Sequence, residues 1–179
     1  FLYFADHEPD LAPLVEKGRR EFMQQFPSAK DPAVVARMTA PHDEATFQRC
    51  KLDFAERTKN AGTYRLFEDL LKLRREDPIF AAQDKASLHG AVLGDGAFAL
   101  RFGTGSGNDR LLVVSLRQSV DAGAVAEPLC APIEGRPWRV LFTTDDPKYG
   151  GPGRAPLGDD GLVPVNGGSA VVLAPGAER

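Results

Sequence analysis

The chain changes character at Phe80, and this change limits the folds open to it more than any other feature. Only two of the 18 glycines precede Phe80, and the other 16 follow it, spaced between short apolar runs. Glycine-punctuated apolar runs are typical of strands joined by turns. The sequence therefore predicts a mainly helical first part, residues 1–82, and an all-β second part, residues 83–179.

The clearest helix lies just before this change, in the segment 63–76. Its apolar residues recur at helical spacing, with charged residues on the opposite side. These apolar residues are Leu66, Phe67, Leu70, Leu71 and Leu73. Asn60 or Thr63 can cap the start, and Asp77 should end the helix because a residue before proline is displaced from the helical region. Burial of this face would contribute roughly 7–15 kcal/mol as an upper bound, so the helix is expected to dock on a substantial surface.

The rest of the first part is predicted to contain shorter elements. A helix is expected from Asp10, as its N-cap, to Phe26, because Pro27 should end it. The three prolines within 27–45 favour an ordered loop with one helical turn, and 46–54 favours a short helix or turn.

The second part is predicted to form six short antiparallel strands. They are expected at 88–93, 97–102, 111–116, 138–143, 162–165 and 170–173. Phe98, Leu100 and Phe102 should share one side of their strand, and Pro164 restricts its strand to an edge. Short strands joined by turns in this way imply a small β-sandwich, so the expected fold is α+β.

Composition excludes several classes of function. A formal charge of −3 supplies no basic field for nucleic acid, and no apolar run reaches the roughly 20 residues of a membrane helix. Cys50 and Cys130 lie far apart without metal-ligand spacing, which argues against structural zinc and disulfides and favours a reducing cytosol. The sequence contains no P-loop, no GxSxG motif and no HExxH motif. We therefore expect no cofactor, no metal, no nucleic-acid partner and no membrane partner.

Three residues are candidates for a position near a substrate. Asp6 and His7 follow the strand-like run 1–4, and barrel enzymes place functional side chains at the ends of strands. Asp53 could accept hydrogen bonds in a pocket. For both acids the competing interpretation is a cap on a turn or helix. No catalytic residue and no metal ligand is assigned.

Other residues have weaker claims. His7, His42 and His89 are far apart in the sequence, so surface or turn positions explain them best. Tyr149 could stack on a sugar, although an aromatic that anchors a glycine-rich loop is the commoner use. Trp138 lies on an alternating strand and is expected in the core.

Several motifs taken together carry a family resemblance. The stretches FLYFADH, GRREF, TFQRCKLDFAER, LFEDLLKLRREDPIF and YGGPG resemble the end of an α-amylase-family glycoside hydrolase, in particular the trehalose-releasing members. Phe54 stands where those relatives often have tryptophan. The resemblance implies the last portion of a (β/α)8 barrel, 1–82, followed by an all-β C-terminal domain.

The resemblance also implies an activity for the longer parent enzyme. Members of this group cleave the α-1,4-glucosidic bond beside the trehalose end of maltooligosyl trehalose, with retention and two carboxylates. Those acids lie on earlier barrel strands, so none is transferred to this sequence, and the chain alone is expected to be inactive. Its expected partners are the rest of the barrel and an α-glucan. A branching enzyme, another α-amylase relative and a non-catalytic glucan-binding module are the alternatives.

Overall fold

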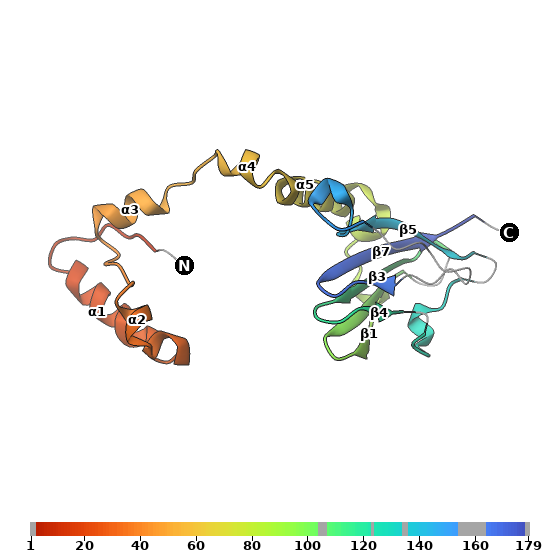
Figure 1. Cartoon of the computed structure of the whole chain (residues 1–179), viewed down its shortest axis with the longest axis horizontal. Helices are drawn as coiled ribbons and strands as arrows, with labels where there is room; N and C mark the ends of the chain where they lie inside the picture. The colour runs from red at the N-terminus through yellow and green to blue at the C-terminus, as the bar shows by residue number, and fades with distance from the viewer. Residues whose placement is uncertain (1–2, 104–106, 123, 134–135, 154–163, 178–179) are drawn as a thin grey trace. The chain divides into compact units, whose positions relative to one another are not determined.

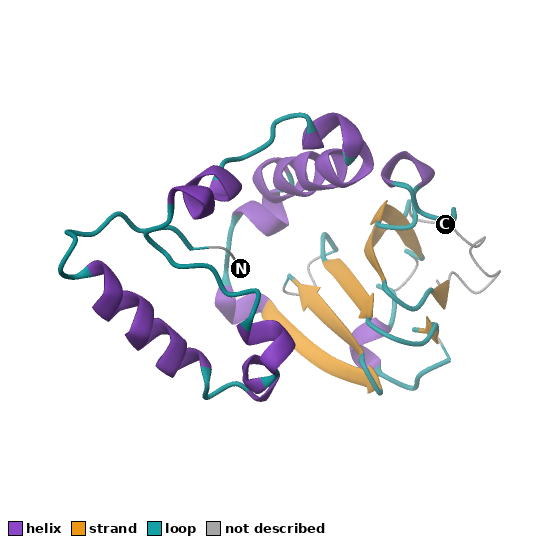
Figure 2. Ribbon diagram, turned by 60° about the vertical axis from the view of Figure 1, so that its left-hand side comes forward, coloured by secondary structure: helices purple, strands orange, loops and turns teal. Residues whose placement is uncertain are grey.

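The computed structural model describes residues 3–103, 107–122, 124–133, 136–153 and 164–177 of the chain (Figure 1). It divides into two compact units, Phe1–Ala55 and Glu56–Arg179. The first unit is helical and the second combines helices with an antiparallel sheet (Figure 2). The predicted α+β class is therefore confirmed, whereas the domain boundary at 82/83 and the barrel origin of the helices stay predictions.

The N-terminal unit contains one long helix and three short ones. They are α1 (Ala12–Met23), the 3-10 turn η1 (Pro27–Lys30), α2 (Pro32–Val35) and α3 (Glu44–Cys50). The predicted N-cap at Asp10 is wrong, because Leu11 occupies that position without a side-chain bond. A turn from Glu8, whose carbonyl accepts the Ala12 N–H, moves the helix start past Asp10.

A small set of contacts joins the start of the chain to α3. The Ala5 N–H donates to the Pro41 carbonyl over 3.1 Å, and the Phe4 and Phe47 ring centroids lie 4.9 Å apart. Thr46 is fully buried, and its hydroxyl donates to the Ala40 carbonyl. Tyr3 and Phe4 belong to no strand, so the strand expected over 1–4 is not seen there, and residues 1–2 lie outside the described ranges.

Helices also open the second unit. The predicted amphipathic helix is α5 (Ala61–Glu76), with Asn60 and Asp77 at its ends, as the sequence predicted. The short helices α4 (Glu56–Lys59) and α6 (Pro78–Ala81) flank it, and the 3-10 turn η2 (Lys85–Ser87) follows. The Asp77 carboxylate accepts the N–H groups of Ile79 and Phe80 and receives the Arg110 Nε donor over 2.8 Å. One acid thus caps α6 and ties it to the sheet.

The sheet has five antiparallel strands in the order β1-β2-β3-β7-β5, and Figure 1 labels β1, β3, β7 and β5. They are β1 (Leu88–Gly94), β2 (Ala97–Phe102), β3 (Arg110–Ser115), β7 (Ser169–Pro175) and β5 (Trp138–Thr143). A two-stranded ribbon pairs β4 (Val120–Asp121) with β6 (Pro164–Val165). Two further 3-10 turns are η3 (Pro128–Cys130) and η4 (Pro147–Tyr149).

Five of the six predicted strands are present in full or nearly so. The sixth, predicted at 162–165, is seen as β6, and residues 162–163 lie outside the described ranges. The sequence missed β4 because a two-residue strand carries no readable alternation.

The deepest core lies on one face of the sheet, where the ribbon packs. Ala99 and Val113 are completely buried there, together with Leu111, Val171 and Trp138. On β2 the small residues, not the large ones, therefore face this core, while Phe98, Leu100 and Phe102 lie half-buried on the other face. The alternation predicted the two sides of the strand but not which side is buried more deeply.

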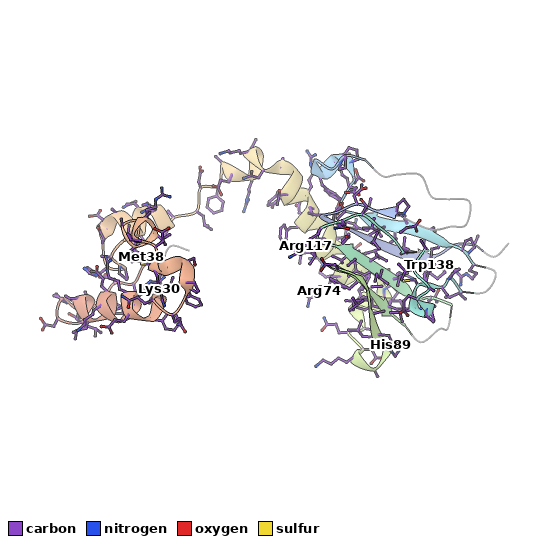
Figure 3. All side chains as sticks on the ribbon, turned by 60° about the horizontal axis from the view of Figure 1, so that its bottom comes forward. Lys30, Met38, Arg74, His89, Arg117 and Trp138 are labelled. Atoms are coloured by element: carbon purple, nitrogen blue, oxygen red, sulfur yellow. The ribbon has the colours of Figure 1, made fainter. Side chains whose placement is uncertain are left out.

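A charged pair lies at the edge of this core. The Arg101 Nε donates to the Asp109 Oδ2 over 2.8 Å, and the Asp109 side chain is 1% exposed. The same guanidinium donates to the Leu129 and Ala131 carbonyls and lies over the ring of Trp138. Trp138 is labelled in Figure 3. A buried carboxylate needs such bonds because an unpaired charge is costly out of water.

Helices α5 and α6 face the other side of the sheet. The Phe80 and Phe102 rings meet edge to face with centroids 5.0 Å apart. A pocket of about 350 Å³ lies between Leu70 and Leu73 on α5 and Leu112 and Val172 on the sheet. The helix is only partly covered, and Tyr64, Phe67 and Leu71 are exposed.

Candidate functional site

The three residues predicted to lie near a substrate are all in the N-terminal unit. Asp6 and Asp53 are exposed, and the Asp53 Oδ1 accepts the Ala55 N–H over 2.9 Å, the capping role that competed with a site role. The bonds recorded for the described residues join none of Asp6, His7 and Asp53 to another. In the described part of the chain, no recorded contact brings the two acids together, and their position near a substrate stays a prediction.

His7 differs from the two acids because its ring is partly enclosed. Its Nε2 atom is shielded from solvent and has no hydrogen-bond partner among the described residues, and the same holds for the Nδ1 atom of His42. A shielded nitrogen without a partner costs free energy, roughly 1–3 kcal/mol. His7 is thus the better supported of the predicted site residues, although its role stays a prediction.

A polar cluster whose members all have shifted pKa values lies in the second unit, where the glycine-rich loop meets α5. The Tyr149 hydroxyl donates to the Asp69 Oδ2 over 2.5 Å, and the Lys148 Nζ lies 2.9 Å from the same oxygen. The Tyr149 ring also packs against Phe142 on β5. The Asp69 side chain stays 38% exposed, so the loop adds two polar partners to a carboxylate that remains partly solvated.

Local sequence explains how the loop presents Tyr149. Asp146 caps η4 by accepting the Lys148 N–H, and Gly150 ends the turn at φ 87°, a conformation that favours glycine. Gly62 allows close approach, since a Cβ there would lie 2.6 Å from the Tyr149 carbonyl oxygen. The sequence motif YGG and one glycine of α5 therefore fit the loop to the helix.

Each member of this cluster has a shifted pKa. The hydrogen bonds from Tyr149 and Lys148 lower the pKa of Asp69. The pKa of Lys148 is raised by its interactions with Tyr149 and Asp69, whereas burial and then the bond to Asp69 raise the pKa of Tyr149. The folded chain thus favours the carboxylate, the ammonium and the neutral phenol, a combination suited to anchoring and not to proton transfer near neutral pH.

Other, more enclosed carboxylates are also held by structural bonds. Asp77 pairs with Arg110 and Asp109 with Arg101. Asp145, buried beside the YGG loop, accepts hydrogen bonds from Ser169 and Asn166. Within the described ranges, no three His, Cys, Asp or Glu residues gather closely enough to hold a metal ion. None of the described helices is long and apolar enough to cross a membrane.

The comparisons with known proteins first define a class. Residues 85–172 match the family described as Domain of unknown function (DUF3459), a C-terminal domain of α-amylase-family enzymes. The match covers β1, β2 and β3 together with the YGG loop, and it stops within β7. The antiparallel part of the chain is therefore similar to the C-terminal domain of glycoside hydrolases of this family.

Particular relatives share one name. The chain is 37% identical over 129 residues to a malto-oligosyltrehalose trehalohydrolase of Deinococcus radiodurans, a match that covers 71% of this chain and 20% of that protein. Proteins of the same name from Arthrobacter ramosus and Mycobacterium tuberculosis are 41% and 36% identical over 44% and 43% of the chain. Each of these matches covers 13% of the relative.

These matches confirm the resemblance that the sequence motifs indicated. The chain resembles the C-terminal part of malto-oligosyltrehalose trehalohydrolases and spans a fifth or less of the length of the relatives it matches. No solved structure matches the chain significantly.

Proposed function

We propose that this chain is the C-terminal portion of a glycoside hydrolase that releases trehalose from maltooligosyl trehalose by cleaving the adjacent α-1,4-glucosidic bond. The observation that carries the proposal is the 37% identity to a malto-oligosyltrehalose trehalohydrolase over 71% of the chain. In the proposed enzyme, residues 1–82 complete a (β/α)8 barrel and 83–179 form a C-terminal β-sandwich.

The catalytic acids of the proposed enzyme lie outside this chain. A retaining glycosidase needs two carboxyl groups about 5 Å apart around the bond, one as nucleophile and one as acid. The partly exposed Asp69 and the enclosed Asp77, Asp109 and Asp145 are all committed to structural bonds. This supports the proposal that the reaction takes place elsewhere in the barrel. The chain itself would contribute packing and residues near the substrate.

Two alternatives fit less well. A branching enzyme or another α-amylase relative is not favoured, because the relatives reported above share a different name. A glucan-binding module would present exposed aromatic side chains. All five aromatics after residue 83 are described, and none is exposed: Phe98, Phe102, Trp138, Phe142 and Tyr149.

An assay on maltooligosyl trehalose tests the proposal. We expect the full-length parent to release trehalose with retention and the 179-residue chain to release none. Asp6→Ala in the parent should weaken substrate use, through a raised KM, without abolishing turnover. Asp10→Ala, an exposed acid of the same segment, is the control. Trehalose release by the purified chain, lost on Asp6→Ala, would overturn the assignment.

The proposal also implies the partners of the protein and its cellular compartment. The partners of the chain are the rest of the barrel and an α-glucan, and the enzyme acts in the cytosol. The free thiols of Cys50 and Cys130 are in keeping with a reducing compartment.

A further inference from the structure

A pocket of about 360 Å³ in the N-terminal unit gathers all the arginines of that unit. They come from three places in the sequence: Arg19 and Arg20 from α1, Arg37 from the segment after α2, and Arg49 from α3. Met38, labelled in Figure 3, lines the same pocket, as does Met23. The fold therefore brings four guanidinium groups to one cavity with a partly apolar wall.

This gathering runs against the charge of the unit as a whole. Residues 1–55 contain seven Lys or Arg and nine Asp or Glu, a net charge of −2. Four of the seven cations line the pocket, but only one of the nine acids, Glu16, does so. The pocket therefore carries +3 in an acidic unit. Like charges held together repel one another, and an anion would relieve this repulsion.

Two of the four guanidinium groups have partners inside the pocket. The Arg20 Nε and Nη2 atoms lie 3.0 and 2.9 Å from the Glu16 Oε1, and the Arg19 guanidinium lies 4.5 Å from the centre of the Tyr3 ring. For Arg37 and Arg49, the described residues provide no recorded hydrogen bond or ion pair. These two side chains have donors available for a ligand.

We propose that this pocket binds the phosphate group of a small organic phosphate ester. Guanidinium groups present paired donors that match phosphate oxygens, and they bind more strongly than neutral donors. The volume falls within the roughly 300–1,000 Å³ of small-molecule sites, and the apolar wall suits the body of the ester. The uncharged substrate of the proposed hydrolase supplies no anion to offset the charge of the pocket, so the proposal concerns a different ligand.

Calorimetry on the 179-residue chain tests this site directly. Inorganic phosphate and glucose 6-phosphate are titrated at low ionic strength, where screening is weak. We expect saturable binding of both, weakened at least tenfold in Arg37→Gln/Arg49→Gln. The matched control is Lys17→Gln/Lys30→Gln, which removes the same charge from the same unit outside the pocket. Its affinity should stay within twofold of the parent chain.

Further variants separate the guanidinium geometry from charge alone. Arg37→Lys/Arg49→Lys keeps the charge but loses the paired donors, so it should also bind phosphate several-fold more weakly. If circular dichroism shows that Arg37→Gln/Arg49→Gln is unfolded, this lysine variant takes its place in the test. Three results would each overturn the proposal: no phosphate binding by the parent chain, an equal loss of affinity in Lys17→Gln/Lys30→Gln, or an equal affinity of the parent chain for acetate. The measurement involves no sugar hydrolysis, so its failure would leave the trehalose-releasing function untouched.

Discussion

Tyr149 joins two segments that lie 80 positions apart in the sequence. Its hydroxyl reaches Asp69 on α5, and its ring packs on Phe142 of the sheet. A side chain held through both its ring and its hydroxyl is an anchor, and this was the commoner of the two interpretations open from the sequence. The sugar-stacking alternative would need an exposed ring, and Tyr149 is half-buried.

Removal of the Tyr149 hydroxyl should loosen this anchor. Tyr149→Phe keeps the ring packing but loses the bond to Asp69, so we expect a melting temperature lower by about 2–5 °C. Tyr64→Phe is the matched control, since the Tyr64 ring contacts Arg57 but its hydroxyl has no recorded bond. Thermal unfolding followed by circular dichroism measures both. An equal melting temperature for Tyr149→Phe and the parent chain would contradict the anchoring role.

The same cluster should make stability depend on pH at both ends of the scale. The pKa of Asp69 is lowered in the folded chain, so its contribution is present above the unfolded value of about 4 and is lost as pH falls through the folded value. The pKa values of Lys148 and Tyr149 are raised, so their contribution is complete below about pH 10 and is lost as pH rises through the folded values.

Asp69→Asn should therefore be less stable than the parent chain at pH 7, with a difference that shrinks toward pH 3. Melting temperatures measured between pH 3 and 8 test this expectation. Glu68→Gln, an exposed neighbour on the same helix, is the control and should show no comparable change. A pH-independent difference for Asp69→Asn would mean that the ionised carboxylate does not hold the loop.

Helix α5 illustrates what one element can and cannot do alone. Its apolar spacing and its ends were predicted correctly, because helical periodicity and the Asp-Pro stop are local signals. Its docking is incomplete in this chain, since no residue of the helix is buried and four of its large apolar side chains are exposed. This agrees with the proposed packing of α5 on a longer barrel.

Two helix glycines should respond in opposite ways to substitution by alanine. Gly62 on α5 faces the backbone of Tyr149 too closely for a Cβ, so Gly62→Ala should destabilise the fold by about 1–3 kcal/mol. Gly18 on α1 has open space around it, so Gly18→Ala should stabilise its helix by about 0.5–1 kcal/mol. Urea denaturation measures both changes. A neutral or stabilising Gly62→Ala would show that the loop does not pack against α5.

At the scale of the whole molecule, α5 and α6 belong to the same compact unit as the sheet. Phe80 packs on Phe102, and Asp77 pairs with Arg110. The boundary predicted at 82/83 rests on sequence pattern and puts these helices in a different domain from the strands. The contacts instead put the helices and the strands in one unit. Both descriptions hold if α5 packs on the proposed barrel with one side and on the β-sheet with the other.

This grouping predicts that 56–179 is more stable than 83–179. The β region should still fold by itself, because its deepest core faces the ribbon and not the helices. Without α5 and α6, however, Phe102 and Leu112 lose their cover and Arg110 loses Asp77. Amide exchange should therefore be faster in β2 and β3 of 83–179. Phe80→Ala within 56–179 should shift exchange in the same direction, and equal protection in both chains would contradict the prediction.

The sequence alone determined the elements of this protein and its family resemblance. Helix α5, strands β1, β2, β3, β5 and β7, and the class of the fold follow from periodicity, proline and glycine, which act within a few residues. The resemblance rested on motifs such as LFEDLLKLRREDPIF and YGGPG, and the named relatives confirm it. The candidate site was predicted much less well, because Asp6, His7 and Asp53 were chosen from their neighbours in the sequence.

Only the tertiary structure decided which residues meet. Asp69 finds its hydrogen-bond partner in a loop 80 positions away in the sequence. On β2 the alanines face the deepest core because the ribbon packs on that side of the sheet. The gathering of Arg19, Arg37 and Arg49 around one pocket likewise follows from how α1, the segment after α2 and α3 pack together. Such partners are fixed by contacts between distant segments, and local spacing carries no information about them.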